Sequence, residues 1–309
     1  MKTIRAILEG DLSSVVESGE LTVVADGFVG LEGPVWHPEG FLTFVDLEGN
    51  KLLRWDPVGG VKLVRHPNLA GNGCTLDDER RLVMCEGATR RIVRLEADGS
   101  WRTLADRWQG SRLNRPNDIV RRSDGSFYFT DPELFVPEEE RDLKTSAIWR
   151  LAPSGDLEMV STGLGFPNGL AFSPDESILY VSNSFQDEHC VHERQRKEVC
   201  THRYLAAFDV GADGSLRNLR KVTDMSSAAH DLPDGLKVDR NGTVFCTGSG
   251  ALWVLDPDGA VMGKILTPDL GRNCAFGDSD RKTLYITALT TVYSLRMRTP
   301  GLSGTGVVP

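Results

Sequence analysis

Short apolar segments, each bounded by Asp, Asn, Pro or Gly, recur about every 40 residues along nearly the whole chain. In each unit a first apolar segment is followed by a turn such as Ser123-Asp124-Gly125 and by a second apolar segment. A third apolar segment and a more polar fourth segment complete the unit. The segments are short and rich in β-branched and aromatic residues, which is typical of strands. No long stretch has a helical periodicity, so we expect antiparallel β-strands throughout.

The second strands share one pattern and read FLTFVD, RLVMCE, SFYFTD, ILYVSN, TVFCTG and TLYITA. Six units of four strands predict an all-β, six-bladed β-propeller. A solenoid is the alternative for such a repeat, but a closed ring leaves no end unit that needs a cap. The last unit stops after its third strand, and a spare strand stands at residues 21–26. We expect that strand to complete the last blade and close the ring. The predicted organisation is an N-terminal arm (1–20), one propeller domain (21–297) and an irregular tail (298–309).

Each unit also carries a side-chain oxygen at the same place, directly before its first apolar strand. The six residues are Glu32, Asn72, Asn117, Asn168, Asp234 and Asn273. In a propeller the first strands all begin at one face near the axis, so these oxygens should point at one centre. Turn chemistry also favours Asn and Asp before a strand and explains single members. A match in all six units favours a shared site.

Carboxylate and amide oxygens without His or Cys are the ligands of a hard cation. We expect one divalent ion, with Ca²⁺ as the first choice and Mn²⁺, Mg²⁺ or Zn²⁺ as alternatives. Glu32 and Asp234 would bring the negative charges, and Asn117 and Asn168 would add neutral oxygens. An open ligand position beside a carboxylate is suited to hydrolysis. Asp118, next to Asn117, either supports the ligands or caps a turn.

Two long insertions fall between second and third strands, at Pro132–Ser146 and Phe185–Arg203. Loops at this position return to the face of the six oxygens, so we expect them to wall the site. The second insertion carries several metal-binding residue types, His189, Cys190, His192, Cys200 and His202. A zinc loop, a Cys190–Cys200 disulfide and an ordinary polar loop all stay open. His230 is either a wall of the pocket or a solvated loop residue.

Composition narrows the class of partner. The 309 residues are 40% hydrophobic and 26% charged, as in soluble globular proteins. The net charge of −9 argues against nucleic acid and against anionic membranes as partners. No apolar run approaches the length of a membrane span, and Glu9 and Asp11 interrupt any secretory signal. We therefore expect a cytoplasmic protein with a small-molecule substrate. Four cysteines within strands, Cys74, Cys85, Cys246 and Cys274, should be core residues.

Four motifs give the chain a family resemblance. They are Glu32-Gly33-Pro34-Val35-Trp36, Asn114-Arg115-Pro116-Asn117-Asp118, Phe166-Pro167-Asn168-Gly169-Leu170 and Pro233-Asp234-Gly235-Leu236. Over about residues 20–297 the chain resembles the senescence-marker-protein/gluconolactonase/luciferin-regenerating-enzyme family, and bacterial gluconolactonases in particular. The segment Phe276–Ala288 resembles the closing blade of that family.

The resemblance implies a propeller with a divalent metal in its central channel. It implies metal ligation by Glu32, Asn168 and Asp234, with Asn117 as a further ligand or a substrate contact. It also implies that Asp234 is the general base, that Arg115 contacts substrate, and that the activity is hydrolysis of sugar lactones. One departure is Glu86-Gly87-Ala88, which stands where many bacterial relatives have a His-Gly pair.

Three functions are compatible with this sequence. The first is a metal-dependent lactonase in which the metal polarises the lactone carbonyl and Asp234 activates water. The second is a phosphotriester hydrolase that uses the same site on organophosphates. The third is a propeller that binds a ligand without catalysis. In each case Asn72, Asp118, Asn273 and His230 are candidates for the channel wall or for residues that support the ligands.

Overall fold

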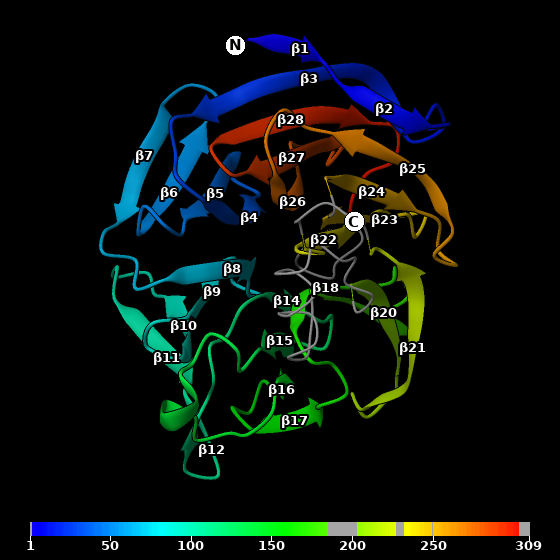
Figure 1. Ribbon diagram of the computed structural model, residues 1–309. Coiled ribbons are helices and arrows are strands. Elements are labelled where there is room, and N and C mark those ends of the chain that lie inside the picture. Colours follow the sequence, from blue (N-terminus) through cyan, green and yellow to red (C-terminus); the bar gives the residue numbers. More distant parts are fainter. Residues whose placement is uncertain (1, 185–202, 227–231, 249, 303–309) are drawn as a thin grey trace.

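The computed structural model describes residues 2–184, 203–226, 232–248 and 250–302. Its antiparallel sheets follow one another around a central axis, as Figure 1 shows. The arrangement is a six-bladed β-propeller, and the predicted all-β fold is confirmed. The only helix among the described residues is one short 3-10 turn, η1 (Glu138–Glu140). Nowhere in those residues is there a helix long and apolar enough to cross a membrane.

Each blade is built on four strands ordered outward from the axis, and two blades have a fifth at the outer edge. The innermost strands are β4 (Leu31–His37), β8 (Gly71–Leu76), β14 (Ile119–Arg121), β18 (Pro167–Phe172), β22 (Leu236–Val238) and β26 (Gly271–Gly277). The second strands are β5 (Phe41–Asp46), β9 (Leu82–Glu86), β15 (Phe127–Asp131), β19 (Ile178–Asn183), β23 (Val244–Gly248) and β27 (Thr283–Ala288). The third strands are β6 (Lys51–Asp56), β10 (Arg91–Leu95), β16 (Ala147–Leu151), β20 (Tyr204–Val210), β24 (Ala251–Leu255) and β28 (Thr291–Met297). The fourth strands are β7 (Gly60–Arg65), β11 (Trp101–Ala105), β17 (Leu157–Ser161), β21 (Leu216–Asp224), β25 (Val261–Leu266) and β3 (Val16–Asp26).

The N-terminal strand closes the ring, as predicted. Strand β3 pairs with β28, with Leu21 opposite Leu295 and Ala25 opposite Val292. The segment expected to be an arm also contains strands. β1 (Thr3–Arg5) pairs with β3, and β2 (Ile7–Gly10) pairs with β25, so the last two blades each have five strands. A separate two-stranded hairpin, β12 (Arg107–Trp108) with β13 (Ser111–Arg112), stands beside the third blade.

The core lies between neighbouring blades rather than at the axis. Every residue of β9, β15, β23 and β27 is buried, because a second strand has a neighbouring blade on each face. Where the ring closes, Trp36 of the first blade stacks on Tyr285 of the last, with ring centroids 5.3 Å apart. The cysteines at positions 74, 85, 246 and 274 are buried and free, as expected.

Shortening a buried side chain of β3, the strand that closes the ring, should destabilise the whole propeller. Leu21 is fully buried between the outer strand and the core of the last blade, so Leu21→Ala should cost about 2 to 5 kcal/mol of unfolding free energy. Ile7→Ala is the matched control, because Ile7 also lies in an N-terminal strand but is 62% exposed. Urea denaturation followed by tryptophan fluorescence measures both variants. Equal, small effects of the two would show that β3 does not close the ring.

Candidate active site

A repeated hydrogen bond fixes the beginnings of the inner strands. The hydroxyl of Thr130 donates to the Asn168 carbonyl (2.6 Å), and that of Ser182 donates to the Asp234 carbonyl (2.7 Å). Thr247 likewise donates to the Arg272 carbonyl (2.6 Å). Each bond joins the second strand of one blade to the inner strand of the next. Residues at neighbouring blade starts are thereby held in one geometry.

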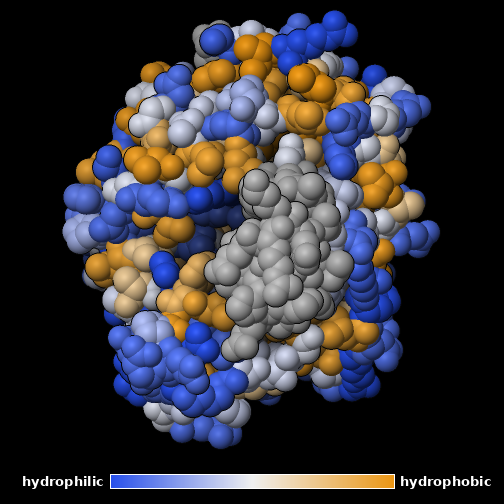
Figure 2. All heavy atoms as spheres, in the orientation of Figure 1, coloured by the Kyte–Doolittle hydropathy of each residue, from blue (hydrophilic) through white to orange (hydrophobic). Residues whose placement is uncertain are grey.

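A cavity of about 510 Å³ opens where the inner strands begin. Five of the six predicted oxygen residues line it, namely Glu32, Asn72, Asn117, Asn168 and Asp234. The insertion between β15 and β16 contributes Phe135 to the wall. Figure 2 shows a hollow near the middle of this face with hydrophilic residues around it. The structure therefore brings five of the six predicted residues together at one mouth of the channel, and Arg272 lines the wall where Asn273 was expected.

Glu32 and Asp234 form the acidic centre of the cavity. Glu32 is only 5% exposed, and burial raises its pKa to about 7. Burial also raises the pKa of Asp234 well above its ordinary range, and the charge of Glu32 raises it further. Without a cation, the two groups therefore hold protons that exposed carboxylates release. Arg272 opposes both shifts, since its positive charge lowers the pKa of each carboxyl.

Asp118 lies behind this centre rather than in the cavity wall. It is 3% exposed, burial raises its pKa, and its Oδ2 atom has no hydrogen-bond partner. Its charge raises the pKa of both Glu32 and Asp234, so three acidic groups share one region of the channel. The predicted supporting role for Asp118 fits this position and stays a prediction.

The amides differ in the bonds they already make. Asn168 donates from Nδ2 to Ser184 Oγ (2.9 Å), which leaves its Oδ1 as an available oxygen. Asn117 is held through its backbone N–H to the Thr130 carbonyl (2.8 Å), and its side chain makes no hydrogen bond within the described residues. Asn273 donates from Nδ2 to Glu32 Oε2 (3.3 Å) and accepts from the N–H of Cys274 (2.9 Å), so it orients Glu32.

Two arginines enter the same cavity. Arg115 is half-buried over the ring of Phe135, 5.0 Å from its centroid, and no carboxylate in the described part of the chain lies within 4.0 Å of it. Burial lowers its pKa. Arg272 pairs with Glu48 at 3.0 Å, and both residues line the cavity. Sequence analysis missed this pair, although Arg272 directly precedes Asn273.

A buried carboxylate fixes the segment that carries Arg115. Asp131 accepts from the N–H of Asn114 (2.9 Å) and from Trp149 Nε1 (3.0 Å). In the blade before, Glu86 is fully buried and ion-paired with Arg65 and Arg91, each at 2.6 Å. Glu86 is therefore a structural residue and does not line the cavity. Predictions for His230 and for the metal-binding residue types of the second insertion lie outside the described residues.

The donors fit a hard divalent cation by their chemistry. Among the described residues, no cluster of three or more His, Cys, Asp or Glu side chains could hold a metal. The predicted set is of another kind, with two carboxylates and two amides. The charge of Glu32 raises the pKa of Asp234, the charge of Asp118 raises the pKa of both, and a positive ion would relieve this crowding.

Comparison with known proteins gives one consistent result. Residues 31–290 match the family described as the SMP-30/Gluconolactonase/LRE-like region. A gluconolactonase of Zymomonas mobilis is 32% identical over 94% of this chain and 83% of its own length. Pentonolactonase XacC of Haloferax volcanii is 29% identical over 83% of this chain and 80% of its own. A solved gluconolactonase structure from Xanthomonas campestris superposes with a TM-score of 0.82, at 32% identity, and covers 96% of this chain and 98% of its own.

The acidic centre predicts how stability depends on pH in the absence of a cation. An acid whose pKa is raised by folding binds its proton more tightly in the folded chain. For Glu32, folded stability should therefore fall as pH rises from its ordinary pKa of 4.5 to about 7. Each such group contributes a slope of at most about 1.4 kcal/mol per pH unit. Denaturation of the chelated protein between about pH 5 and about pH 8 measures it.

Glu32→Gln is the matched variant, because glutamine keeps the shape but does not titrate. It should remove the Glu32 share of the slope and raise stability at the alkaline end. A chelated wild-type protein that gains stability over this range would contradict the crowded, buried centre.

Proposed function

The chain belongs to the SMP-30/Gluconolactonase/LRE-like family, and from this premise we propose that it is a lactonase that opens sugar lactones with a divalent cation. The observation that carries the proposal is the convergence of two buried carboxylates and two amides on one cavity beside Arg115. A scaffold that only binds a partner has no use for this crowding of acids.

Different residues of the cavity are available to contact different parts of the substrate. Arg115 has no intramolecular carboxylate within ion-pair distance in the described residues, so its guanidinium is available to the hydroxyl groups of a sugar. Asn117 offers both a donor and an acceptor, because its side chain is unbonded among the described residues. Phe135, beneath Arg115, supplies an apolar wall that excludes water on that side.

Ring opening consumes one water and moves one of its protons to the ring oxygen in two transfers. The water oxygen bonds to the lactone carbonyl carbon, the ring C–O bond breaks, and the ring oxygen takes up a proton to give a hydroxy acid. Asp234 accepts the proton of the attacking water and returns it to the leaving oxygen. A cation held by Glu32, Asn117, Asn168 and Asp234 would polarise the lactone carbonyl and favour the ionised form of both carboxylates.

Replacing the base should leave the fold and remove most of the activity. Asp234→Asn should lower kcat for D-glucono-1,5-lactone by about 10²- to 10⁴-fold, the usual contribution of a general base. Proton release at neutral pH measures ring opening after spontaneous hydrolysis is subtracted. Asp258→Asn is the matched control, since Asp258 is an exposed turn residue of the same blade. Near wild-type turnover by Asp234→Asn would contradict the assignment of Asp234 as the general base.

The same assays separate the lactonase from the phosphotriester hydrolase. The wild-type protein should have a much larger kcat/KM for the lactone than for paraoxon. A larger kcat/KM for paraoxon than for the lactone would mean that the substrates are phosphotriesters, hydrolysed at the same site. No turnover of lactones, esters or paraoxon with metal present would favour a binding protein.

Removing the cation should affect activity and stability together. Chelation should abolish lactone opening and lower the melting temperature, because an ion that binds only the folded chain stabilises it. The gain is about 2.7 kcal/mol when the ion is present at about 100 times its Kd. Ca²⁺ should restore both properties, and Mn²⁺, Mg²⁺ and Zn²⁺ are tested in parallel. Glu32→Gln should need more added ion to reach the same rate. A chelated protein that melts unchanged and still opens lactones would exclude a metal site.

A further inference from the structure

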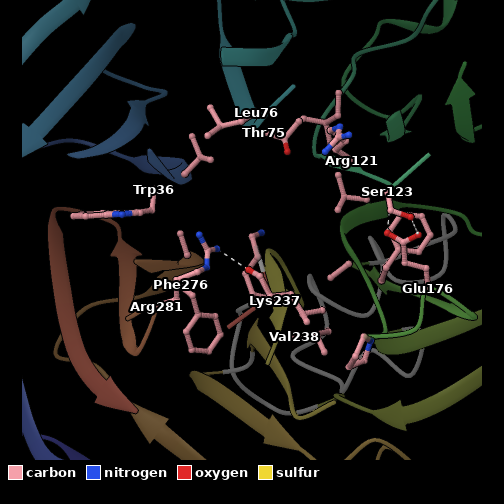
Figure 3. Close-up of a pocket in the computed structure, with 18 of the residues that line it drawn as sticks. Trp36, Thr75, Leu76, Arg121, Ser123, Glu176, Lys237, Val238, Phe276 and Arg281 are labelled. Atoms are coloured by element: carbon pink, nitrogen blue, oxygen red, sulfur yellow. Dashed lines mark hydrogen bonds between the residues drawn. The ribbon is translucent and has the colours of Figure 1, made fainter. Parts of the chain in front are cut away.

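A second cavity, of about 260 Å³, lies at the opposite end of the channel, where the inner strands end. Figure 3 shows it with Arg281, Phe276 and Lys237 on one side and Thr75, Leu76 and Arg121 on the other. All six blades contribute to its wall. The wall is mainly apolar and includes Trp36, Leu76, Ile119, Phe172, Val238 and Phe276. The proposed lactonase site makes no use of this space.

Lys237 places a positive charge at a position of the inner strand where the other five blades have uncharged residues. On its inner strand it stands at the position of Val35, Thr75, Val120, Ala171 and Ala275 in the other blades. Its ammonium group donates to the carbonyl of Leu236, its own neighbour, at 2.9 Å. An ammonium with one neutral acceptor retains two donors.

Besides Arg121, two arginines line the same cavity, Arg240 and Arg281. Arg281 donates from Nη2 to the Leu302 carbonyl at 2.6 Å, while its buried Nε has no hydrogen-bond partner. Burial and the nearby charge of Arg240 lower the pKa of Arg281 to about 10. In the described part of the chain, neither arginine nor Lys237 has a carboxylate within 4.0 Å. Lys237, Arg240 and Arg281 therefore line one cavity with no ion-pair partner among the described residues, in a protein whose net charge is −9.

The acidic groups near this cavity are already engaged. Asp175 accepts from Ser173 Oγ at 2.7 Å and from Ser177, and Glu176 accepts from the N–H of Ser123 at 2.8 Å. Arg121, which also lines the cavity, is ion-paired with Asp78. Asp118 lies closer to the other mouth of the channel, where Glu32 and Asp234 stand. There burial raises its pKa and the charge of Lys237 lowers it, but no ion pair joins the two.

We propose that this second cavity binds a small organic anion with a hydrocarbon body, of the medium-chain carboxylate class. The carboxylate would accept hydrogen bonds from Lys237 and Arg281, and the chain would lie along the apolar wall. The cations explain why a neutral hydrocarbon is the poorer ligand. The apolar wall explains why an inorganic anion, which has no hydrocarbon to bury, is also the poorer ligand.

The test uses octanoate as the probe, with octanol and inorganic phosphate as the matched ligands that lack one of its two features. Isothermal titration calorimetry on the metal-free full chain measures affinity, and tryptophan fluorescence, to which Trp36 in the wall contributes, gives a second readout. Octanoate should bind at least about tenfold more tightly than octanol, the effect of one charge-assisted hydrogen bond. Lys237→Met and Arg281→Met should each weaken octanoate by a similar factor and leave octanol unchanged.

Three further variants locate the binding. Lys237→Arg, which keeps the charge, should retain octanoate binding. Arg115→Met removes a cation of the other cavity and should leave octanoate binding unchanged. Either methionine variant alone suffices if the other does not fold. Equal affinity for octanoate and octanol, loss of binding in Arg115→Met, or no effect of both methionine substitutions would each overturn the proposal. None of these outcomes depends on whether the protein is a lactonase.

Discussion

The close approach of six inner strands around one axis is the constraint on which the structure depends. At Gly33, Gly73, Gly169 and Gly235, directly after an oxygen residue, an added Cβ would collide with the next blade. Backbone bonds between blades use this closeness, as in Gly73 N–H to the Asn117 carbonyl and Gly235 N–H to the Arg272 carbonyl, both 2.8 Å. A larger residue would separate the strands and move the oxygens apart. The geometry of the cavity therefore follows from backbone packing.

The same packing arranges charge in layers along the channel. Five oxygen residues and Arg272 form the first layer, and in the second layer Asp118 is the one charged member among glycines and Asn273. Lys237 is the one charged side chain of the third layer. Burying a charged group in a protein interior costs free energy unless the group is paired. The crowded acids at one mouth are where we propose a metal cation, and Lys237 and Arg281 at the other are where we propose an organic anion.

Much of this could be predicted from the sequence, because strand register repeats. The six oxygen residues were predicted to lie together because they precede equivalent strands of a closed ring. Five of them line one cavity, whereas in the last blade Arg272 does so in place of Asn273. The hydroxyls at Thr130, Ser182 and Thr247 carry the same kind of signal and were overlooked, although each stands one residue before the end of its strand. Arg272 was missed because its partners Glu48 and Glu32 lie more than two hundred residues away. The pairing of β2 with β25 was missed for the same reason, since nothing local specifies which blade edge a terminal strand joins.

The proposed function requires that Glu32, Asn117, Asn168 and Asp234 together hold a cation. Anomalous diffraction from crystals of the chelated protein soaked in Mn²⁺ tests this requirement most directly, because the scattering locates the ion without assuming its ligands. If these residues bind the ion, one anomalous peak should lie within about 2.6 Å of their side-chain oxygens, which is the upper limit for an oxygen–metal distance of this kind. No such peak should appear for Glu32→Gln at the same low Mn²⁺ concentration. A protein that opens lactones at full rate with no ion at these four residues would contradict the proposed metal site.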